Sequence, residues 1–339
     1  MTRLQDVSLC TALPPRLRRV DGMPRRVGFE IEFLGLSLAD AGEAIIEVFG
    51  GVQQQAHKYE GTVTTAEHGV FRLELDASLL KSITAEILRK RASDENPWWE
   101  EAKDTILAPL VTRIAPYEII SPPLPMNPAS IRQMDTLVEA LRRRGAKGTG
   151  AATHYAFGMH INAEAVSLEA ADLLNYVRAF ILLYDWLLLH MRMDRTRRLT
   201  AFAQPYPEEY ARMVLDSDYA PDMATLIDDY IAYNPSRDRA LDLLPIFLLC
   251  DPGRVRAQLD SPLIRPRPAL HFRMPNSRVD EPDWLISHEW IHWVEVERLA
   301  ANPRLLRRMA ARYLGTGQSP LHLISARWRL ETERWRQWM

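Results

Sequence analysis

The sequence predicts an α+β fold in which an antiparallel or mixed sheet is followed by a helical C-terminal portion. Strand-like and helix-like segments alternate over the first half of the chain, and two hairpin-like segments interrupt this alternation. Hairpins join antiparallel strands, whereas a doubly wound parallel sheet needs a crossover helix between its strands. Beyond residue 167 the chain reads mainly as long helices.

The expected elements follow from local signals along the chain. Ser37 is a candidate N-cap with Asp40 three residues later, and Gly50-Gly51 ends that helix. Asn127-Pro128 starts a second helix, which Gly145 ends. The expected strands are 26–36, 117–121, 156–163 and 269–274, with a hairpin over 52–78 that turns around 61–69 and a helix over 97–113.

Composition restricts the class of protein. The chain has 339 residues, of which 47% are hydrophobic and 25% charged, as in an ordinary globular protein. Its net charge of -2 gives no basic field for nucleic acid. With only Cys10 and Cys250, a disulfide framework and a cysteine-based zinc site are excluded. The apolar stretch 181–189 contains Asp185 and is too short to span a bilayer, so we expect a cytoplasmic protein without a membrane segment.

The first predicted strand carries two carboxylates on one face. Because side chains alternate along a strand, Glu30 and Glu32 share a face while Phe29, Ile31 and Phe33 share the other. Residues two apart lie about 7 Å apart along a strand. Two carboxylates at that spacing repel each other, and a cation relieves the repulsion. On its own, the same alternation also describes any amphipathic strand.

Further predicted strands also carry polar groups on a single face. Glu118 stands beside Ile119-Ile120, where a carboxylate is costly to bury unless it is paired or metal-bound. The other polar residues of this kind are Glu74 and Asp76, His160 and Asn162, and His271 and Arg273. Together these segments predict a sheet with one chemically reactive face.

These segments, in this order, resemble the amidoligase branch of the glutamine synthetase-like superfamily of carboxylate–amine ligases, which includes glutamate–cysteine ligase. The matching segments are 28–33, 76–79, 118–123, 158–162 and 271–276. The resemblance implies a curved antiparallel sheet backed by helices, with the active site on its concave face. It also implies ATP-dependent amide or peptide-bond formation through an acyl phosphate, in which an amine displaces the phosphate.

The resemblance also implies roles for individual residues. Glu32, Asp76 and Glu118 would hold one magnesium ion, and Glu30, His160 and His271 a second. Arg273 would contact phosphate or the developing negative charge. Asn162, which stands where relatives often carry a second histidine, would also help to bind the cofactor. Arg273 and Glu30 are thus the expected catalytic residues. Relatives usually have Glu where this chain has His271, so the second site is weakened, adapted to manganese or zinc, or a mark of a degenerate enzyme.

The resemblance defines the expected domains and ligands. We expect an arm over 1–24, the catalytic domain over 25–280 and packed C-terminal helices over 281–339. The expected cofactors are ATP and Mg²⁺, or Mn²⁺ in its place, and the substrates are a small-molecule or peptide carboxylate and an amine. Lys58, which precedes a predicted strand, is either a phosphate or carboxylate ligand or an exposed hairpin residue.

Two other functions compete with a ligase. His288-Glu289-x-x-His292 has the spacing of a zinc peptidase helix, with Glu331 or Glu333 as a third ligand. A non-catalytic ligase-like scaffold is the other alternative, which would bind a protein partner or a second copy through the Arg- and Trp-rich C-terminus. The plain alternative for that C-terminus is a solvated helical face. Gly145 and Gly150 have phosphate-loop spacing, but Ala151-Ala152 replaces the required Lys-Ser/Thr, so we expect a helix end and a turn there.

Overall fold

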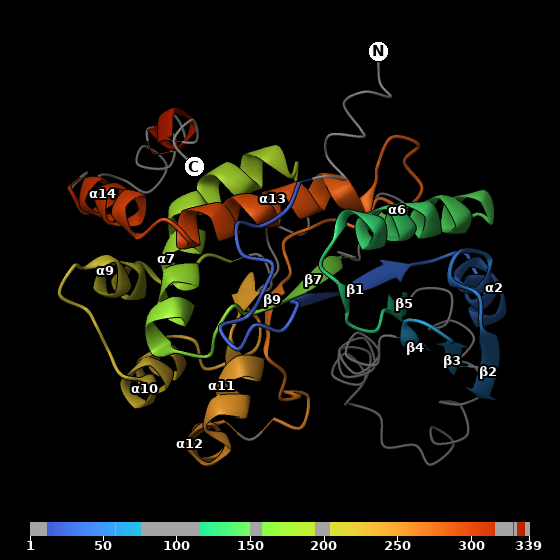
Figure 1. Cartoon of the computed structure of the whole chain (residues 1–339), viewed down its shortest axis with the longest axis horizontal. Coiled ribbons are helices and arrows are strands. Elements are labelled where there is room, and N and C mark those ends of the chain that lie inside the picture. Colours follow the sequence, from blue (N-terminus) through green and yellow to red (C-terminus); the bar gives the residue numbers. More distant parts are fainter. Residues whose placement is uncertain are drawn as a thin grey trace, which may run out of the picture.

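The computed structural model describes residues 12–57, 59–75, 116–149, 158–193, 204–259, 261–315, 328 and 331–335. It has a mixed α+β architecture, as the sequence predicts, with one sheet and helices packed against it (Figure 1). The expected helix at 97–113 and the residues Lys58 and Asp76 lie outside the described residues.

Within the described residues the sheet has nine strands, and the neighbouring strands pair antiparallel. The order is β2-β3-β4-β5-β1-β7-β9-β8, with β6 also paired to β1, so the sheet does not close into a barrel. The strands are β1 (Arg26–Phe33), β2 (Val52–His57), β3 (Glu60–Thr65), β4 (Gly69–Leu75), β5 (Tyr117–Ile120), β6 (Leu124–Pro125), β7 (Met159–Glu164), β8 (Leu241–Asp242) and β9 (Ala269–Phe272).

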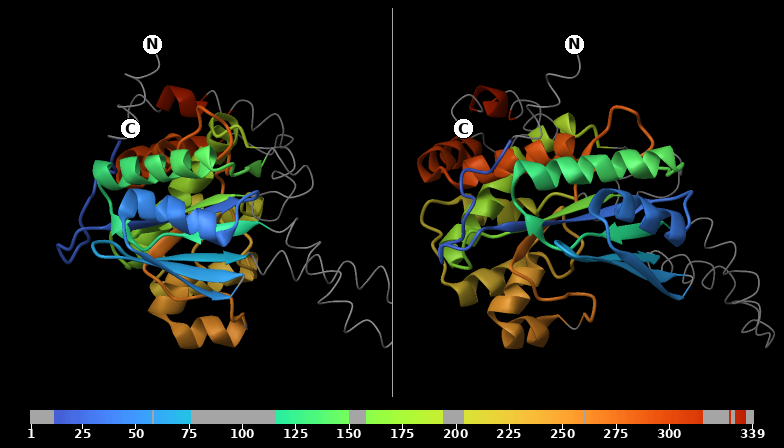
Figure 2. Two further views of the ribbon diagram at one scale, coloured as in Figure 1. Left: turned by 90° about the vertical axis from the view of Figure 1, so that its right-hand side faces the viewer. Right: turned by 45° about the vertical axis from the view of Figure 1, so that its right-hand side comes forward.

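Helices cover both sides of the sheet. They are α2 (Leu38–Phe49), α6 (Pro128–Arg143), α7 (Ala170–His190), α9 (Glu208–Leu215), α10 (Met223–Tyr233), α11 (Leu244–Cys250), α12 (Pro252–Gln258), α13 (Ile286–Ala300) and α14 (Pro303–Leu314). Figure 2 shows α6 and α13 on one side of the sheet, with α11 and α12 on the other. The sheet face that carries the chemistry is therefore partly covered at its β8–β9 end.

Local signals in the sequence set the helix ends. Ser37 forms a complete capping box with Asp40 at the start of α2, and Gly50 ends that helix at a φ of 67°. Asn127 caps α6 by accepting a hydrogen bond from the backbone of Ser130. Gly145 follows α6 with a φ of 97°, a conformation that favours glycine. The expectations for these two helices are confirmed.

The described residues of segment 52–78 differ from the predicted single hairpin. They form three strands, β2, β3 and β4, and a turn lies between Thr65 and Gly69. Gly61 lies inside β3 rather than in a turn, because the following Thr62-Val63-Thr64-Thr65 run favours an extended strand. The short strand β8 also escapes prediction, since two residues carry no periodic signal.

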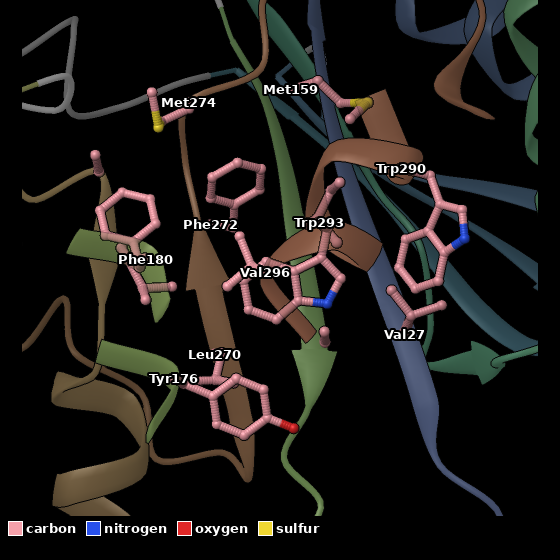
Figure 3. Packing of buried hydrophobic residues seen from close by; sticks show 14 of the residues in the cluster. Val27, Met159, Tyr176, Phe180, Leu270, Phe272, Met274, Trp290, Trp293 and Val296 are labelled. Carbon is pink, nitrogen blue, oxygen red and sulfur yellow. The ribbon is translucent and has the colours of Figure 1, made fainter. Parts of the chain in front are cut away.

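The apolar face of the sheet packs against α13. Phe29 of β1 meets Trp290 with ring centroids 6.3 Å apart, and Phe272 of β9 meets Trp293 at 5.5 Å. Figure 3 shows these indoles beside Val27, Phe272 and Leu270. All four aromatic side chains are fully buried. Because α13 covers the apolar face of β1 and β9, the polar side chains of these strands lie on the opposite face of the sheet.

Helix α7 serves as a core helix. Among the described residues it is the helix that is long and apolar enough to cross a membrane, but 61% of its most apolar window is buried inside the protein. It lies alongside α13 and α14. Length and composition alone therefore do not distinguish it from an ordinary buried helix.

A buried ion pair joins Arg25, the residue directly before β1, to Glu297 of α13. Arg25 donates to both carboxylate oxygens of Glu297, at 2.5 and 2.9 Å, and both side chains are almost completely buried. Tyr176 and Trp293 also donate to Glu297, at 3.1 and 2.9 Å. Arg25 donates further to the backbone oxygen of Glu164 on β7. A single carboxylate thus ties β1 and α7 to α13.

Replacing Arg25 by Met should destabilise the protein by about 3–5 kcal/mol, because Glu297 would be left as an uncompensated buried charge. The double variant R25M/E297Q should recover much of this loss, since it removes the charge but keeps an acceptor for Tyr176 and Trp293. Urea denaturation measures both values. R26M, which alters the exposed neighbour, is the control and should change stability by no more than about 0.5 kcal/mol; equal effects of R25M and R26M would contradict the assignment.

Candidate active site

Strand pairing brings the predicted polar residues onto one face of the sheet. In β1, Glu30 lies directly opposite His160 of β7, and Glu32 lies opposite Glu118 of β5. Asn162 of β7 lies opposite His271 of β9. Directly opposed residues in an antiparallel sheet share a face, so these groups converge although they come from four separate strands.

Glu30 is the centre of a hydrogen-bonded network. Its Oε2 lies 2.7 Å from His160 Nδ1, and its Oε1 accepts from Asn162 Nδ2 at 2.8 Å. Asn162 Oδ1 lies 2.7 Å from His271 Nδ1. Since Asn162 turns its NH₂ group to the carboxylate, its oxygen must accept from His271. This places the proton of His271 on Nδ1 and leaves the lone pair on Nε2.

Burial and neighbouring charges set the ionisation of the network. Burial lowers the pKa of His271 well below its usual range, and the nearby Arg273 acts in the same direction. Burial alone would raise the pKa of Glu30, but the influence of His271 and the hydrogen bond with His160 outweigh it and hold that pKa well below its ordinary value. Near neutral pH, Glu30 is therefore ionised and His271 is neutral.

A row of carboxylates runs across the same face of the sheet, from β1 toward β3. Glu32, Glu118, Glu74 and Glu60 are directly opposed from strand to strand across β1, β5, β4 and β3. Like charges directly opposite each other destabilise a sheet. Glu32 also accepts a 2.7 Å hydrogen bond from the backbone of Gly158. Such a row suits cations rather than anions.

Two groups of side chains in the described part of the chain could hold a metal ion. One consists of Glu32, Glu118 and His160, and the other of Glu30, His160 and His271; within each, the donor atoms lie within 4.8 Å of one another. The first group differs from the implied set by including His160, whose Nε2 lies 3.8 Å from Glu32 Oε1. Asp76, the third implied ligand of that set, lies outside the described residues.

Arg273 lies at the β8–β9 edge of the same face. Its Nη2 lies 3.5 Å from Asp242 Oδ2, and both residues are almost completely buried. Burial raises the pKa of Asp242, while Arg273 opposes that rise. Asp242 was not predicted, because β8 has only two residues. Arg267, which donates to Asn162 Oδ1 at 2.9 Å, was also missed, since it lies between two prolines outside any strand pattern.

The residues of the zinc-peptidase spacing lie apart from this face. Glu289 is only 3% exposed, and His292 Nδ1 lies 3.7 Å from its carboxylate. Neither His288 nor His292 belongs to a potential metal-binding group among the described side chains. Glu331 pairs with arginines, and Glu333 accepts from an indole and from an imidazole. The described residues therefore do not bring a histidine pair and a third ligand together.

A comparison with protein families identifies the chain. Residues 23–295 match the family model described as "putative amidoligase enzyme". The chain belongs to this amidoligase family. No curated protein and no solved structure matches it. The matched range begins before β1 and ends within α13, so it includes every described residue of the charged sheet face.

The two donor groups of the amidoligase differ in chemistry. In the first group, Glu32 and Glu118 offer carboxylate oxygens, the ligands that magnesium prefers, and His160 adds one imidazole. Glu30, His160 and His271 offer two imidazoles and one carboxylate, a combination that suits manganese or zinc better than magnesium. The first group therefore fits magnesium through its two carboxylates and the second fits a softer divalent ion, with His160 shared between them.

The buried His271 should make stability depend on pH. Unfolded, its imidazole binds a proton near pH 6.5, whereas the folded state holds it neutral to a much lower pH. Because the unfolded state then binds more protons, the free energy of unfolding should fall as the pH drops below about 6.5, by at most about 1.4 kcal/mol per pH unit from this group. H271Q should lose this contribution.

Chemical denaturation at a series of pH values between 7 and 5 measures the effect. The control is H68Q, which removes a half-buried imidazole beside Phe49, away from the network. If H271Q and wild type show parallel pH profiles, the neutral state of His271 in the fold is wrong.

Proposed function

We propose that the protein is an ATP-dependent carboxylate–amine ligase that forms an amide or peptide bond with the help of divalent metal ions. The observation that carries the proposal is the convergence of Glu30, Glu32, Glu118 and His160 on one sheet face of an amidoligase-family chain. The substrates we propose are a small-molecule or peptide carboxylate and an amine, and the setting is the cytoplasm.

The charge requirement of the reaction supports this proposal. ATP would supply the phosphoryl group that activates the substrate carboxylate as an acyl phosphate, from which the amine displaces phosphate. ATP and a carboxylate are both anions, so a site that brings them together must neutralise their charge. The carboxylate row would hold the cations that do this, with Glu32 and Glu118 as magnesium ligands.

The protein's own groups would orient the reactants. Arg273 would face the negative charge that develops during transfer, because its guanidinium presents a planar fork of hydrogen-bond donors. Glu30 would hold His160 and Asn162 in fixed orientations through their hydrogen bonds. Positioning of this kind contributes much of the rate in phosphoryl transfer.

Turnover tests the proposal directly. The protein is incubated with ATP, Mg²⁺ or Mn²⁺, and pools of amino acids, peptides and amines, and the release of ADP and phosphate is measured together with the mass of any amide product. E32Q and E118Q should each reduce turnover about 100-fold or more, since each removes a charged metal ligand.

The matched control is E43Q, because Glu43 is an exposed residue of α2, which packs on the face of the sheet opposite the carboxylates. It should keep turnover within about 2-fold of wild type. Full activity in both E32Q and E118Q would show that the metal assignment is wrong, and absence of turnover over the whole panel in a folded protein would favour a non-catalytic scaffold.

The identity of residue 271 should determine which metal ion supports activity. Wild type should prefer Mn²⁺ to Mg²⁺, because the second group contains two imidazoles. H271E gives the second group two carboxylates and one imidazole. It should therefore raise the ratio of Mg²⁺- to Mn²⁺-supported rates about 10-fold. H271Q serves as the control, because it removes the imidazole without adding a charge; an unchanged ratio in H271E would mean that residue 271 does not contact the metal.

A further inference from the structure

The ladder between β1 and β7 departs from the regular antiparallel pattern at Glu32. The register places Ile31 opposite Met159. The next pair along the two strands is therefore Glu32 and Gly158. In a regular hydrogen-bonded pair, each residue donates its backbone N–H to the carbonyl oxygen of the other. Glu32 does donate to the Gly158 oxygen, at 3.1 Å, but Gly158 donates its N–H to the Glu32 side chain, whose Oε2 lies 2.7 Å away.

Ser277 supplies the donor that the ladder would otherwise provide. Its hydroxyl donates to the backbone oxygen of Glu32 at 2.5 Å, and Ser277 is fully buried. Because a backbone carbonyl inside a sheet needs a donor, this bond leaves the Gly158 N–H available for the carboxylate. A hydrogen bond to a charged acceptor is also stronger than one to a neutral carbonyl. The exchange of donors therefore fixes the Glu32 side chain.

The fixed carboxylate turns its other oxygen toward the metal-binding side. While Gly158 holds Oε2 of Glu32, Oε1 lies 3.8 Å from His160 Nε2. Glu32 and His160 belong to the same potential metal-binding group, together with Glu118. The backbone thus orients one oxygen, and the other faces the atoms that would share a cation with it. Hydrogen bonds that orient a metal ligand in this way contribute strongly to metal affinity.

The segment that carries Ser277 has a defined position relative to β1. Thr149 donates to the Ser277 backbone oxygen through both its backbone N–H and its hydroxyl, at 2.7 and 2.9 Å. Met159 donates its N–H to the backbone oxygen of Pro275 at 3.0 Å. Gly148 lies so close that a Cβ at this position would be 2.3 Å from the Ser277 oxygen. These contacts hold the hydroxyl of Ser277 at the end of the ladder.

We propose that Ser277 is a positioning residue for the Glu32 carboxylate: its hydroxyl binds the Glu32 carbonyl, and the Gly158 N–H thereby holds the carboxylate in the orientation that binds a divalent cation. This inference rests on the proposed metal-assisted function and adds a residue that lies outside both metal-binding groups. Without the Ser277 hydroxyl, the Gly158 N–H would return to the Glu32 carbonyl, as in a regular ladder. The carboxylate would then lose its fixed orientation.

The amide proton of Gly158 reports this exchange without metal, nucleotide or substrate. Labelling glycine with ¹⁵N and the phenylalanine carbonyl with ¹³C selects the glycines that follow phenylalanine, which are Gly50 and Gly158. Because a hydrogen bond to a charged acceptor is shorter and stronger, it shifts the amide proton further downfield. E32Q should move the Gly158 resonance upfield and so identify it, and S277A should move it in the same direction. Gly50, at the end of α2, should not move in either variant.

Metal affinity reports the consequence of the exchange. Mn²⁺ binding is measured from the EPR signal of the free ion, without nucleotide or substrate, in H271Q, which removes one donor of the second group. Adding S277A to this background should weaken Mn²⁺ binding about 10-fold. Thermal melts check that each variant is folded.

The matched control is T149V, which removes the other hydroxyl of the same loop contact and leaves the Ser277 donor in place. It should leave the Gly158 resonance unmoved and keep Mn²⁺ affinity within about 2-fold, because the Glu32 carboxylate keeps its orientation. If Ser277 served only to hold the loop, T149V and S277A would behave alike.

An unmoved Gly158 resonance in S277A, or equal losses of Mn²⁺ affinity in S277A and T149V, would overturn the proposal. Absence of Mn²⁺ binding to H271Q itself would count against the proposed metal-assisted function alone, because the Gly158 amide tests the positioning role without metal.

Discussion

The register of β1 against its two neighbours is the constraint on which the site depends. Pairing with β5 sets Glu32 opposite Glu118, and pairing with β7 sets Glu30 opposite His160. A shift of one residue would turn the carboxylates into the core. The core prevents this shift, because Phe29 packs on Trp290 and the other apolar residues of β1 are fully buried. The packing of one face thus fixes the chemistry of the other.

The charged face changes in character from one edge to the other. Carboxylates occupy the side from β3 to β1, an imidazole and an amide occupy β7, and guanidinium groups follow at the β8–β9 edge. Asn162 stands between the two halves, since it binds Glu30, His271 and Arg267 at once. A polarised surface of this kind can hold cations and anions side by side without either losing its partner.

Sequence reasoning works best where the signal is local and periodic. The alternation in β1 predicts which side chains share a face, and Ser37 and Asn127 predict where two helices begin. It fails where an element is too short to show a period, as in β8, and so it misses Asp242. It also misses Arg267, whose contact with Asn162 of β7 depends on the path of the loop before β9 rather than on the residues next to Arg267 in the sequence. Strand order across the sheet is likewise set by contacts between distant segments, which composition does not encode.

The position of β1 in the middle of the sheet affects how the chain can be made. During translation this strand leaves the ribosome early, while β7 follows only after more than a hundred further residues. At about 5–20 residues per second, the wait is on the order of ten seconds. Until then β1 can pair only with β5 and β6, and its apolar face still lacks α13, whose Trp290 packs on Phe29. The apolar face of β1 can therefore reach its final packing only after α13 has been synthesised, so the sheet and its covering helix have to be completed together late in synthesis.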